Sequence, residues 1–163
     1  MDISYLGESK FKIKGKNGSV VADTTALTVS HKTGGEDFVI TEPGEYEVEG
    51  ISVFGSKINE SKIYVVQCDD VRVVYLGSLN KTLSEKEITD LENIDVVIVG
   101  VDTLPMKDTI EIVSKLEPYY ILPYGEMTGK FISSYEHSSR AVKSLNLSKL
   151  GMSEDLTEVI TFE

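Results

Sequence analysis

The hydrophobic pattern of this chain changes its period at about residue 84, and this change limits the folds open to it. Before that point, short apolar or alternating runs are separated by turn residues, as in a meander of β-strands. After it, runs with helical spacing alternate with continuous apolar runs. The strands predicted for the first part are residues 2–6, 11–14, 19–23, 27–30, 38–40, 46–49, 51–54, 62–67 and 71–76.

The second part begins with a capping box, in which Ser84 stands at the N-cap and Glu87 three residues later. Helices are predicted over 85–91, over 106–117 between two prolines, and near 128–136. The strands predicted here are residues 95–99, 119–122, 141–147 and 158–162. Strands followed by alternating strands and helices indicate an α/β protein with a two-sheet core and helices packed outside, as a compact single domain over residues 1–163.

Charge and composition exclude several classes of function. Sixteen basic and 27 acidic residues give a net charge of −11, so the chain would repel a phosphate backbone. No apolar run is long enough to span a bilayer, and the first residues lack the features of a signal peptide. The single cysteine, Cys68, lies in an apolar strand run and is predicted to be a small buried hydrophobe. We expect a cytoplasmic protein that binds neither nucleic acid nor membranes.

The sequence has none of the common catalytic motifs. It contains no G-x-S-x-G nucleophile elbow, no phosphate-binding G-x-x-x-x-G-K-[ST] and no G-x-G-x-x-G. Two histidines, His31 and His137, and one cysteine are few for a zinc cluster. Residues 28–37 read TVSHKTGGED, in which a β-branched run delivers His31 to a glycine-containing turn at the rim of a sheet. The ligands of any metal site are expected to gather there.

Several segments together match one family. They are ISYLGESKFKI at 3–13, VVAD at 20–23, TVSH at 28–31, EPGEYEVEG at 42–50, YLGSL at 75–79, DVVIV at 95–99 and LEPYYILP at 116–123. In these segments, and in the closing residues 141–150 and 156–162, the chain resembles the metallo-β-lactamase superfamily, in its small branch of ascorbate-6-phosphate-lactonase-like hydrolases. The resemblance implies a four-layer αβ/βα sandwich and a hydrolase with a dinuclear metal site.

The ligand loop of that family reads His-x-His-x-Asp-His, and this chain keeps only its first position. His31 matches, while Thr33, Gly35 and Glu36 each replace a ligand. A threonine hydroxyl is a poor zinc ligand and a glycine offers no side-chain ligand atom, so the loop could contribute His31 and Glu36 at most.

The other ligand positions have changed as well. Glu8 stands where the family has a histidine, Ser78 where it has a metal-bridging aspartate, and Gly125 where it has a late histidine. Asp23 does match an aspartate that closes an early strand, but the loop after it is cut to residues 24–26. Two metal ions need a bridging anionic oxygen and several ligands each, and this set does not supply them.

We therefore expect a hydrolase fold that has lost its dinuclear metal site and its catalysis, with no metal ligands, no cofactor and a role in binding or assembly. A small molecule, another protein or a second copy of the chain are the expected partners. An exposed aromatic patch is sought at Tyr119, Tyr120 and Tyr124, with core packing expected for at least two of them. The residues expected to surround one vestigial pocket are Glu8, Asp23, His31, Thr33, Gly35, Glu36, Ser78 and Gly125.

Two alternatives keep a chemistry. The first is a metal-dependent hydrolase of lactones or phosphoesters with Zn or Mn held by a reduced ligand set around His31 and Glu36, to which Asp23 or Glu126 could add an oxygen. The second is metal-free chemistry with His31 as general base, although spacing identifies no partner carboxylate for it.

Overall fold

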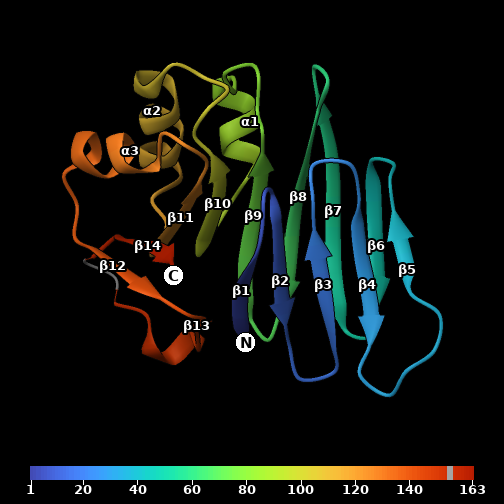
Figure 1. Cartoon of the computed structure of the whole chain (residues 1–163). Coiled ribbons are helices and arrows are strands. Elements are labelled where there is room, and N and C mark those ends of the chain that lie inside the picture. The colour runs from blue at the N-terminus through green and yellow to red at the C-terminus, as the bar shows by residue number, and fades with distance from the viewer. Residues whose placement is uncertain (154–155) are drawn as a thin grey trace.

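The computed structural model describes residues 1–153 and 156–163, which build two β-sheets packed face to face (Figure 1). The six-stranded sheet has the order β13-β1-β2-β3-β4-β5, and the eight-stranded sheet has the order β12-β14-β11-β10-β9-β8-β7-β6. The strands of the first sheet are β1 (Asp2–Gly7), β2 (Lys10–Lys14), β3 (Gly18–Ala22), β4 (Leu27–His31), β5 (Phe38–Ile40) and β13 (Leu145–Asn146). Those of the second are β6 (Gly44–Val48), β7 (Ile51–Ile58), β8 (Ser61–Cys68), β9 (Val71–Gly77), β10 (Val96–Gly100), β11 (Tyr120–Tyr124), β12 (Ser139–Val142) and β14 (Glu158–Phe162).

Strand direction follows the change of hydrophobic period. The neighbouring strands from β1 to β5 and from β6 to β9 pair antiparallel. The strands β9, β10, β11 and β14 pair parallel, and the connections between them carry the helices. The change of period explains this arrangement, because a parallel neighbour needs a long crossover whereas an antiparallel one needs only a turn.

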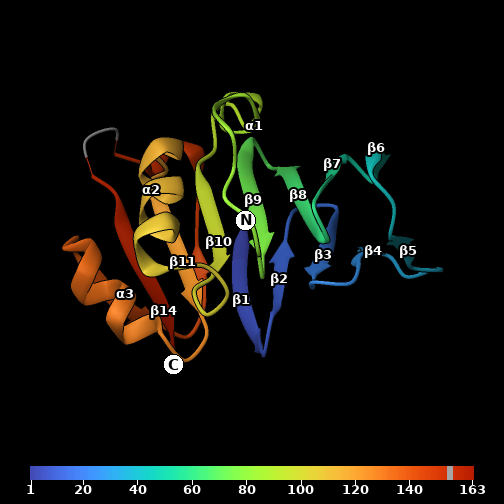
Figure 2. The same cartoon turned by 90° about the horizontal axis from the view of Figure 1, so that it is seen from above.

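Three helices cover part of one sheet. They are α1 (Glu85–Asp90), α2 (Met106–Leu116) and α3 (Thr128–Tyr135), and a short 3₁₀ turn, η1 (Lys149–Gly151), precedes β14. Their apolar side chains pack against the outer face of the eight-stranded sheet, and Figure 2 shows all three helices on that side. The predicted capping box is present at α1, where Glu87 N–H donates to Ser84 Oγ at 3.2 Å and Ser84 N–H donates to Glu87 Oε2 at 2.7 Å.

The fold class predicted from the sequence is confirmed, with one difference in its layers. In the described residues no helix covers the outer face of the six-stranded sheet, so the layers are helix, sheet, sheet. A row across that face runs through paired positions Ser4, Lys12, Val21, Thr28 and Val39, which are half-buried or exposed. The face is therefore a solvated surface of mixed polarity.

The closing segment also differs from the prediction. A single strand was expected over 141–147, but β12 and β13 belong to different sheets. β12 pairs parallel with β14 at the edge of the larger sheet, and β13 pairs antiparallel with β1 at the edge of the smaller one. The segment therefore joins the two sheets along one side of the molecule.

Two apolar cores follow from this layering. One fills the space between the sheets and includes Phe11, Val29, Tyr75 and Cys68, and the other lies between the larger sheet and the helices. Cys68 is 3% exposed, so the prediction of a small buried hydrophobe is confirmed. The pKa of Cys68 is raised to about 11. Burial is the largest cause, the nearby Asp69 carboxylate adds to the rise, and the N-terminal ammonium opposes it.

Cys68 should therefore be unreactive in the folded protein. At pH 7.5 we expect the thiol to react with a disulfide reagent at least about 100-fold more slowly than in the urea-unfolded chain, because the folded thiol yields very little thiolate and lies in the core. Stopped-flow absorbance with an aromatic disulfide in both states measures the ratio. Equal rates in the two states would contradict the buried position.

Candidate functional site

The turns after β1, β3, β9, β10 and β11 lie at the same edge of the molecule, which is its top in Figure 1 and is called the upper edge here. Four of the predicted site residues lie there: Glu8, Asp23, Ser78 and Gly125. Glu8 is an exposed turn residue with a φ of 54°, and its carbonyl accepts a hydrogen bond from Tyr5 Oη at 2.8 Å. The other three are tied into hydrogen-bonded clusters by their neighbours.

Asp23 is held by local hydrogen bonds to its carboxylate. Ser9 Oγ donates to Asp23 Oδ1 at 2.5 Å, and Thr24 N–H donates to the same oxygen at 2.7 Å. Burial raises the pKa of this carboxyl, but the hydrogen bonds from Ser9 and Thr24 and the positive charge of Lys10 outweigh burial and lower the pKa below 3.8. Asp23 is thus an anion, and its Oδ1 already accepts hydrogen bonds from Ser9 and Thr24.

Two tyrosines fill the space behind Asp23 and Ser78. Tyr75 is fully buried and its Oη donates to the carbonyl of Ser9 at 2.7 Å, while Tyr124 Oη lies 3.5 Å from Ser78 Oγ. Burial raises the pKa of both phenols, and the proximity of Tyr124 raises that of Tyr75 further. Both phenols are neutral near pH 7, so neither offers the anionic oxygen that a metal ion requires.

The position of the family's late histidine is occupied by Gly125, in a turn that Asp102 holds. Gly125 has a φ of +118°, and a Cβ built there would lie 2.3 Å from Asp102 Oδ2. Asp102 holds this turn, because its Oδ2 accepts the N–H of Glu126 and its Oδ1 accepts the N–H of Met127, each at 2.9 Å. A side chain at position 125 would collide with the group that shapes the loop, so the position is committed to glycine.

The other four predicted residues lie at the opposite edge. β4 runs antiparallel to β3, with Ala22 opposite Leu27 and Gly18 opposite His31, so β4 delivers His31 to the lower edge in Figure 1. The prediction of one pocket is therefore wrong for the ligand-loop residues His31, Thr33, Gly35 and Glu36. The cause is the connection of residues 23–26, which is closed by a hydrogen bond from Asp23 N–H to the Ala26 carbonyl at 3.0 Å and is too short for a parallel return.

His31 has a carboxylate partner that spacing did not identify. Its Nδ1 lies 2.8 Å from Oε1 of Glu49, a residue of the turn between β6 and β7. The pair joins the edges of the two sheets, and Thr33, Gly35 and Glu36 follow in an exposed loop. The two strands that bring the pair together are far apart in sequence and belong to different sheets, so only the fold reveals the contact.

The residues present do not fit a dinuclear zinc site. The upper edge carries the carboxylates of Glu8, Asp23, Asp102 and Glu126, of which Asp23 and Asp102 accept hydrogen bonds from protein N–H or O–H donors, and both histidines lie elsewhere. Across residues 1–153 and 156–163, no group of three or more His, Cys, Asp or Glu side chains is arranged to hold a metal ion. Across the same residues, no helix is long and apolar enough to cross a membrane.

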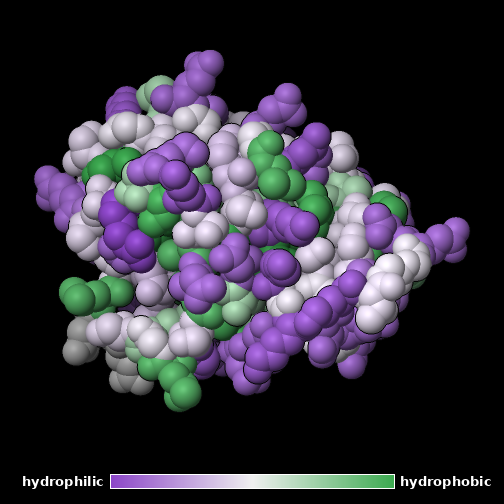
Figure 3. Space-filling model, turned by 60° about the horizontal axis from the view of Figure 1, so that its bottom comes forward, coloured by the Kyte–Doolittle hydropathy of each residue, from purple (hydrophilic) through white to green (hydrophobic). Residues whose placement is uncertain are grey.

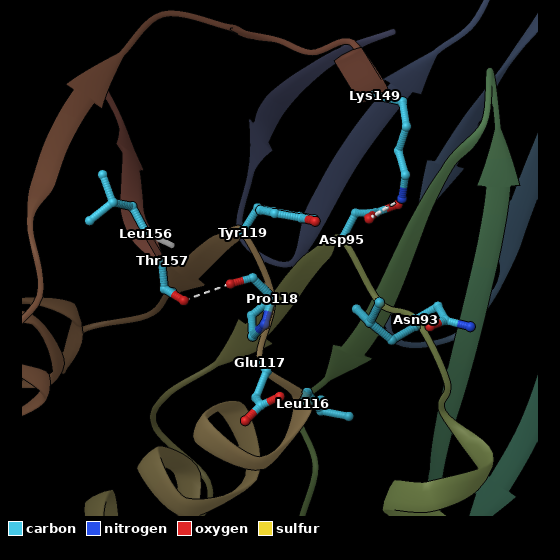
Figure 4. A pocket seen from close by; sticks show the side chains of 10 residues that line it. Asn93, Asp95, Leu116, Glu117, Pro118, Tyr119, Lys149, Leu156 and Thr157 are labelled. Carbon is cyan, nitrogen blue, oxygen red and sulfur yellow. Dashed lines mark hydrogen bonds and ion pairs between the residues drawn. The ribbon is translucent and has the colours of Figure 1, made fainter. Parts of the chain in front are cut away.

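A cavity of about 520 Å³ lies where β10 and β11 begin, at the opposite edge from Asp23 (Figure 4). Its buried carboxylate, Asp95, accepts from Lys149 Nζ at 2.5 Å and from the N–H of Arg72 at 2.8 Å, and Thr157 Oγ1 donates to the Pro118 carbonyl at 2.7 Å. These contacts tie η1 and the approach to β14 to the larger sheet. Figure 3 shows this lower face as mostly hydrophilic, with separate hydrophobic patches.

Of the three tyrosines considered for an exposed patch, two pack against the core, as expected for at least two of them. Tyr124 is buried, and Tyr119 and Tyr120 are half-buried, with Tyr120 packed against the core between the sheets. Tyr119 lines the cavity beside Asp95. The most exposed large hydrophobic residues are instead Leu150 and Leu156, which lie near the end of the chain.

Comparison with protein families identifies the fold family. A model described as "Beta-lactamase superfamily domain" matches residues 35–125, which is more than half of the 163 residues. The chain belongs to the beta-lactamase superfamily. The match spans β5 to β11 and begins after His31, so the only histidine of the ligand loop lies outside it.

One solved structure agrees at the level of the fold. A protein from Thermotoga maritima, named as a candidate Zn-dependent hydrolase of the metallo-beta-lactamase superfamily, is 19% identical with a TM-score of 0.82, and the match covers 100% of both chains. A candidate metal-dependent hydrolase from Parabacteroides distasonis is 11% identical with a TM-score of 0.48, covering 78% of this chain and 93% of that one. No curated protein matches the chain. The lactonase-like branch stays a prediction.

The commitment of position 125 to glycine can be measured as stability. We expect Gly125→Ala to lower the free energy of unfolding by about 2 kcal/mol or more, because the left-handed backbone is strained and Asp102 must move. Gly129→Ala is the matched control, since Gly129 lies in α3 and a Cβ there meets nothing within 4 Å, so alanine should be neutral or stabilising by about 0.5–1 kcal/mol. Equal urea denaturation midpoints for the two variants would contradict the geometry.

The Ser9 hydrogen bond should be visible in the titration of Asp23. In Ser9→Ala the pKa of Asp23 should rise, because burial still raises it while the strongest hydrogen bond that lowers it is gone. With a lowered folded pKa, Asp23 stabilises the protein above its unfolded pKa and loses that contribution as pH falls through the folded pKa, so Ser9→Ala should be less sensitive to acid. Carboxyl NMR titration measures the shift. Thr24→Val, which keeps the shorter backbone hydrogen bond, should move the pKa less than Ser9→Ala does.

Proposed function

We propose that this chain is a non-catalytic member of the beta-lactamase superfamily, which keeps the hydrolase fold, holds no metal cofactor and acts in binding or assembly. The observation that carries the proposal is the Gly125 turn. Its φ of +118° and the Asp102 carboxylate against it leave no room for a ligand side chain at the late-strand position. A single replaced ligand can be compensated, but here the surrounding loop has been rebuilt around a different carboxylate.

The separation of His31 from Asp23 supports the same proposal. A metal ion needs its ligands within about 2–2.6 Å of one point, and the two residues lie at opposite edges of the six-stranded sheet. His31 is paired with Glu49, and Asp23 is engaged by Ser9 and Thr24. Among residues 1–153 and 156–163, neither edge brings three or more His, Cys, Asp or Glu side chains together at one point.

An assembly role is favoured by the open side of the molecule. β5 and β6 are the edge strands of the two sheets, and Phe38 and Val39 on β5 are 42% and 57% exposed. Unpaired edge strands with apolar side chains can pair with another chain. A small molecule, another protein or a second copy of the chain remain the proposed partners. Net charge disfavours nucleic acid, and the single buried cysteine is in keeping with the cytoplasm.

Elemental analysis tests the proposal directly. The purified protein is incubated with Zn²⁺ and with Mn²⁺, desalted, and assayed for metal content and for hydrolysis of lactones and phosphoesters. We expect metal well below one equivalent and no hydrolysis above background. The unmatched ligand positions are the physical reason, since the remaining carboxylates already accept hydrogen bonds from the protein.

Metal retained at one or two equivalents, together with hydrolysis, would contradict the proposal. His31→Ala then distinguishes the sources of that activity. Loss of both metal and hydrolysis in this variant would establish a hydrolase built around His31 and Glu36, whereas retention of both would place the metal at the upper edge with Asp23.

A further inference from the structure

The eight-stranded sheet extends beyond the helices that cover it and leaves a hollow beside α1. In Figure 2 the helices lie over β9, β10, β11 and β14, while β7 and β8 continue past α1. The hollow has a volume of about 440 Å³, within the range of small-molecule sites. Its apolar floor is made by Phe54, Ile58, Ile63, Val65 and Leu91.

Two cations stand at the rim of this hollow, Arg72 and Lys57. The guanidinium of Arg72 lies over the ring of Phe54, 5.8 Å from its centroid. Arg72 Nε donates to the Glu92 carbonyl at 3.0 Å and Nη1 donates to Gln67 Oε1 at 3.2 Å, so the planar group is held in place by neutral acceptors. Within the part of the chain that the structure describes, neither Arg72 nor Lys57 forms an ion pair.

The two carboxylates at the same rim already have partners. Glu87 Oε2 accepts the N–H of Ser84 in the capping box of α1, and Asp90 is paired with Lys86 at 2.8 Å. Asp90 is therefore paired on the helix itself. Lys57 lies five residues along β7 from Ser52, which stands in the row of Gln67 and Arg72, so Arg72 is the cation beside Phe54 that is left for a ligand. An apolar floor with a fixed guanidinium above an aromatic ring favours a molecule with an apolar body and one anionic group.

We infer that this hollow is a binding site for a small apolar anion, such as an aromatic carboxylate, with its body on Phe54, Val65 and Leu91 and its charge at Arg72. The site is separate from the upper edge, since none of its residues belongs to the Asp23 or Asp102 clusters. It therefore does not depend on whether the chain holds a metal ion.

The test uses the full chain and the fluorescent probe 8-anilinonaphthalene-1-sulfonate, which combines an aromatic body with one anionic group. We expect saturable one-to-one binding that weakens about tenfold in Arg72→Gln, as for a lost hydrogen bond to a charged group. The backbone N–H of Arg72, which binds Asp95, is unchanged in that variant. Lys107→Gln makes the same charge change on exposed α2 and should leave binding unaltered.

Two further measurements make the result specific. Amide chemical-shift changes on titration should centre on β7, β8 and the end of α1, and the uncharged analogue N-phenyl-1-naphthylamine should bind more weakly than the sulfonate. Shift changes centred on Leu150 and Leu156, equal binding of the charged and uncharged probes, or equal affinity of Arg72→Gln and Lys107→Gln would each overturn the inference.

Discussion

The connection between β3 and β4 determines where the chemistry-bearing residues of this protein lie. Asp23 N–H bonds to the Ala26 carbonyl, and the chain reverses at once into β4. A parallel pair of strands requires a crossover of about a dozen residues or more, so this connection allows only the antiparallel arrangement. As a result, the strand that starts beside Asp23 ends at the far edge, and residues that match a family's site in sequence do not share a site in space. This short turn thus places His31 and Asp23 at opposite edges of the six-stranded sheet.

The upper edge is stabilised by carboxylates that accept hydrogen bonds from the protein. Asp102, from the end of β10, accepts two backbone N–H groups at the start of α3, where Met127 provides no side-chain cap of its own. A negative charge near a helix N-terminus is favourable, so Asp102 both shapes the Gly125 turn and stabilises α3. Ser9 Oγ donates to Asp23, and the carbonyl of Ser9 in turn accepts from Tyr75 Oη. Asp23 and Asp102 each accept two short hydrogen bonds from the protein, so part of their hydrogen-bonding capacity is already used.

The sequence predicted the fold better than the site, and the reason is the range over which each is encoded. The capping box at Ser84, the prolines around α2 and the apolar run 96–99 are local signals, and each marks an element that the structure contains. The position of the site residues depended on the direction of β4. That direction is set by the short loop before β4, and the hydrophobic alternation of the strands does not show it. Asp102 was missed although it follows a buried strand at its carboxyl end, a position where functional side chains are common. Glu49 and Arg72 had no sequence signal, because their partners come from other strands.

Binding needs groups whose interactions are not already complete, and this condition separates the two regions of the molecule. At the upper edge, Asp23, Asp102 and Tyr75 make short hydrogen bonds within the protein, and a ligand there would have to displace them. Beside α1, the guanidinium of Arg72 keeps N–H groups without a protein acceptor among the described residues, and it is fixed in place before any ligand arrives. Preorganised donors over an apolar floor cost little conformational entropy on binding.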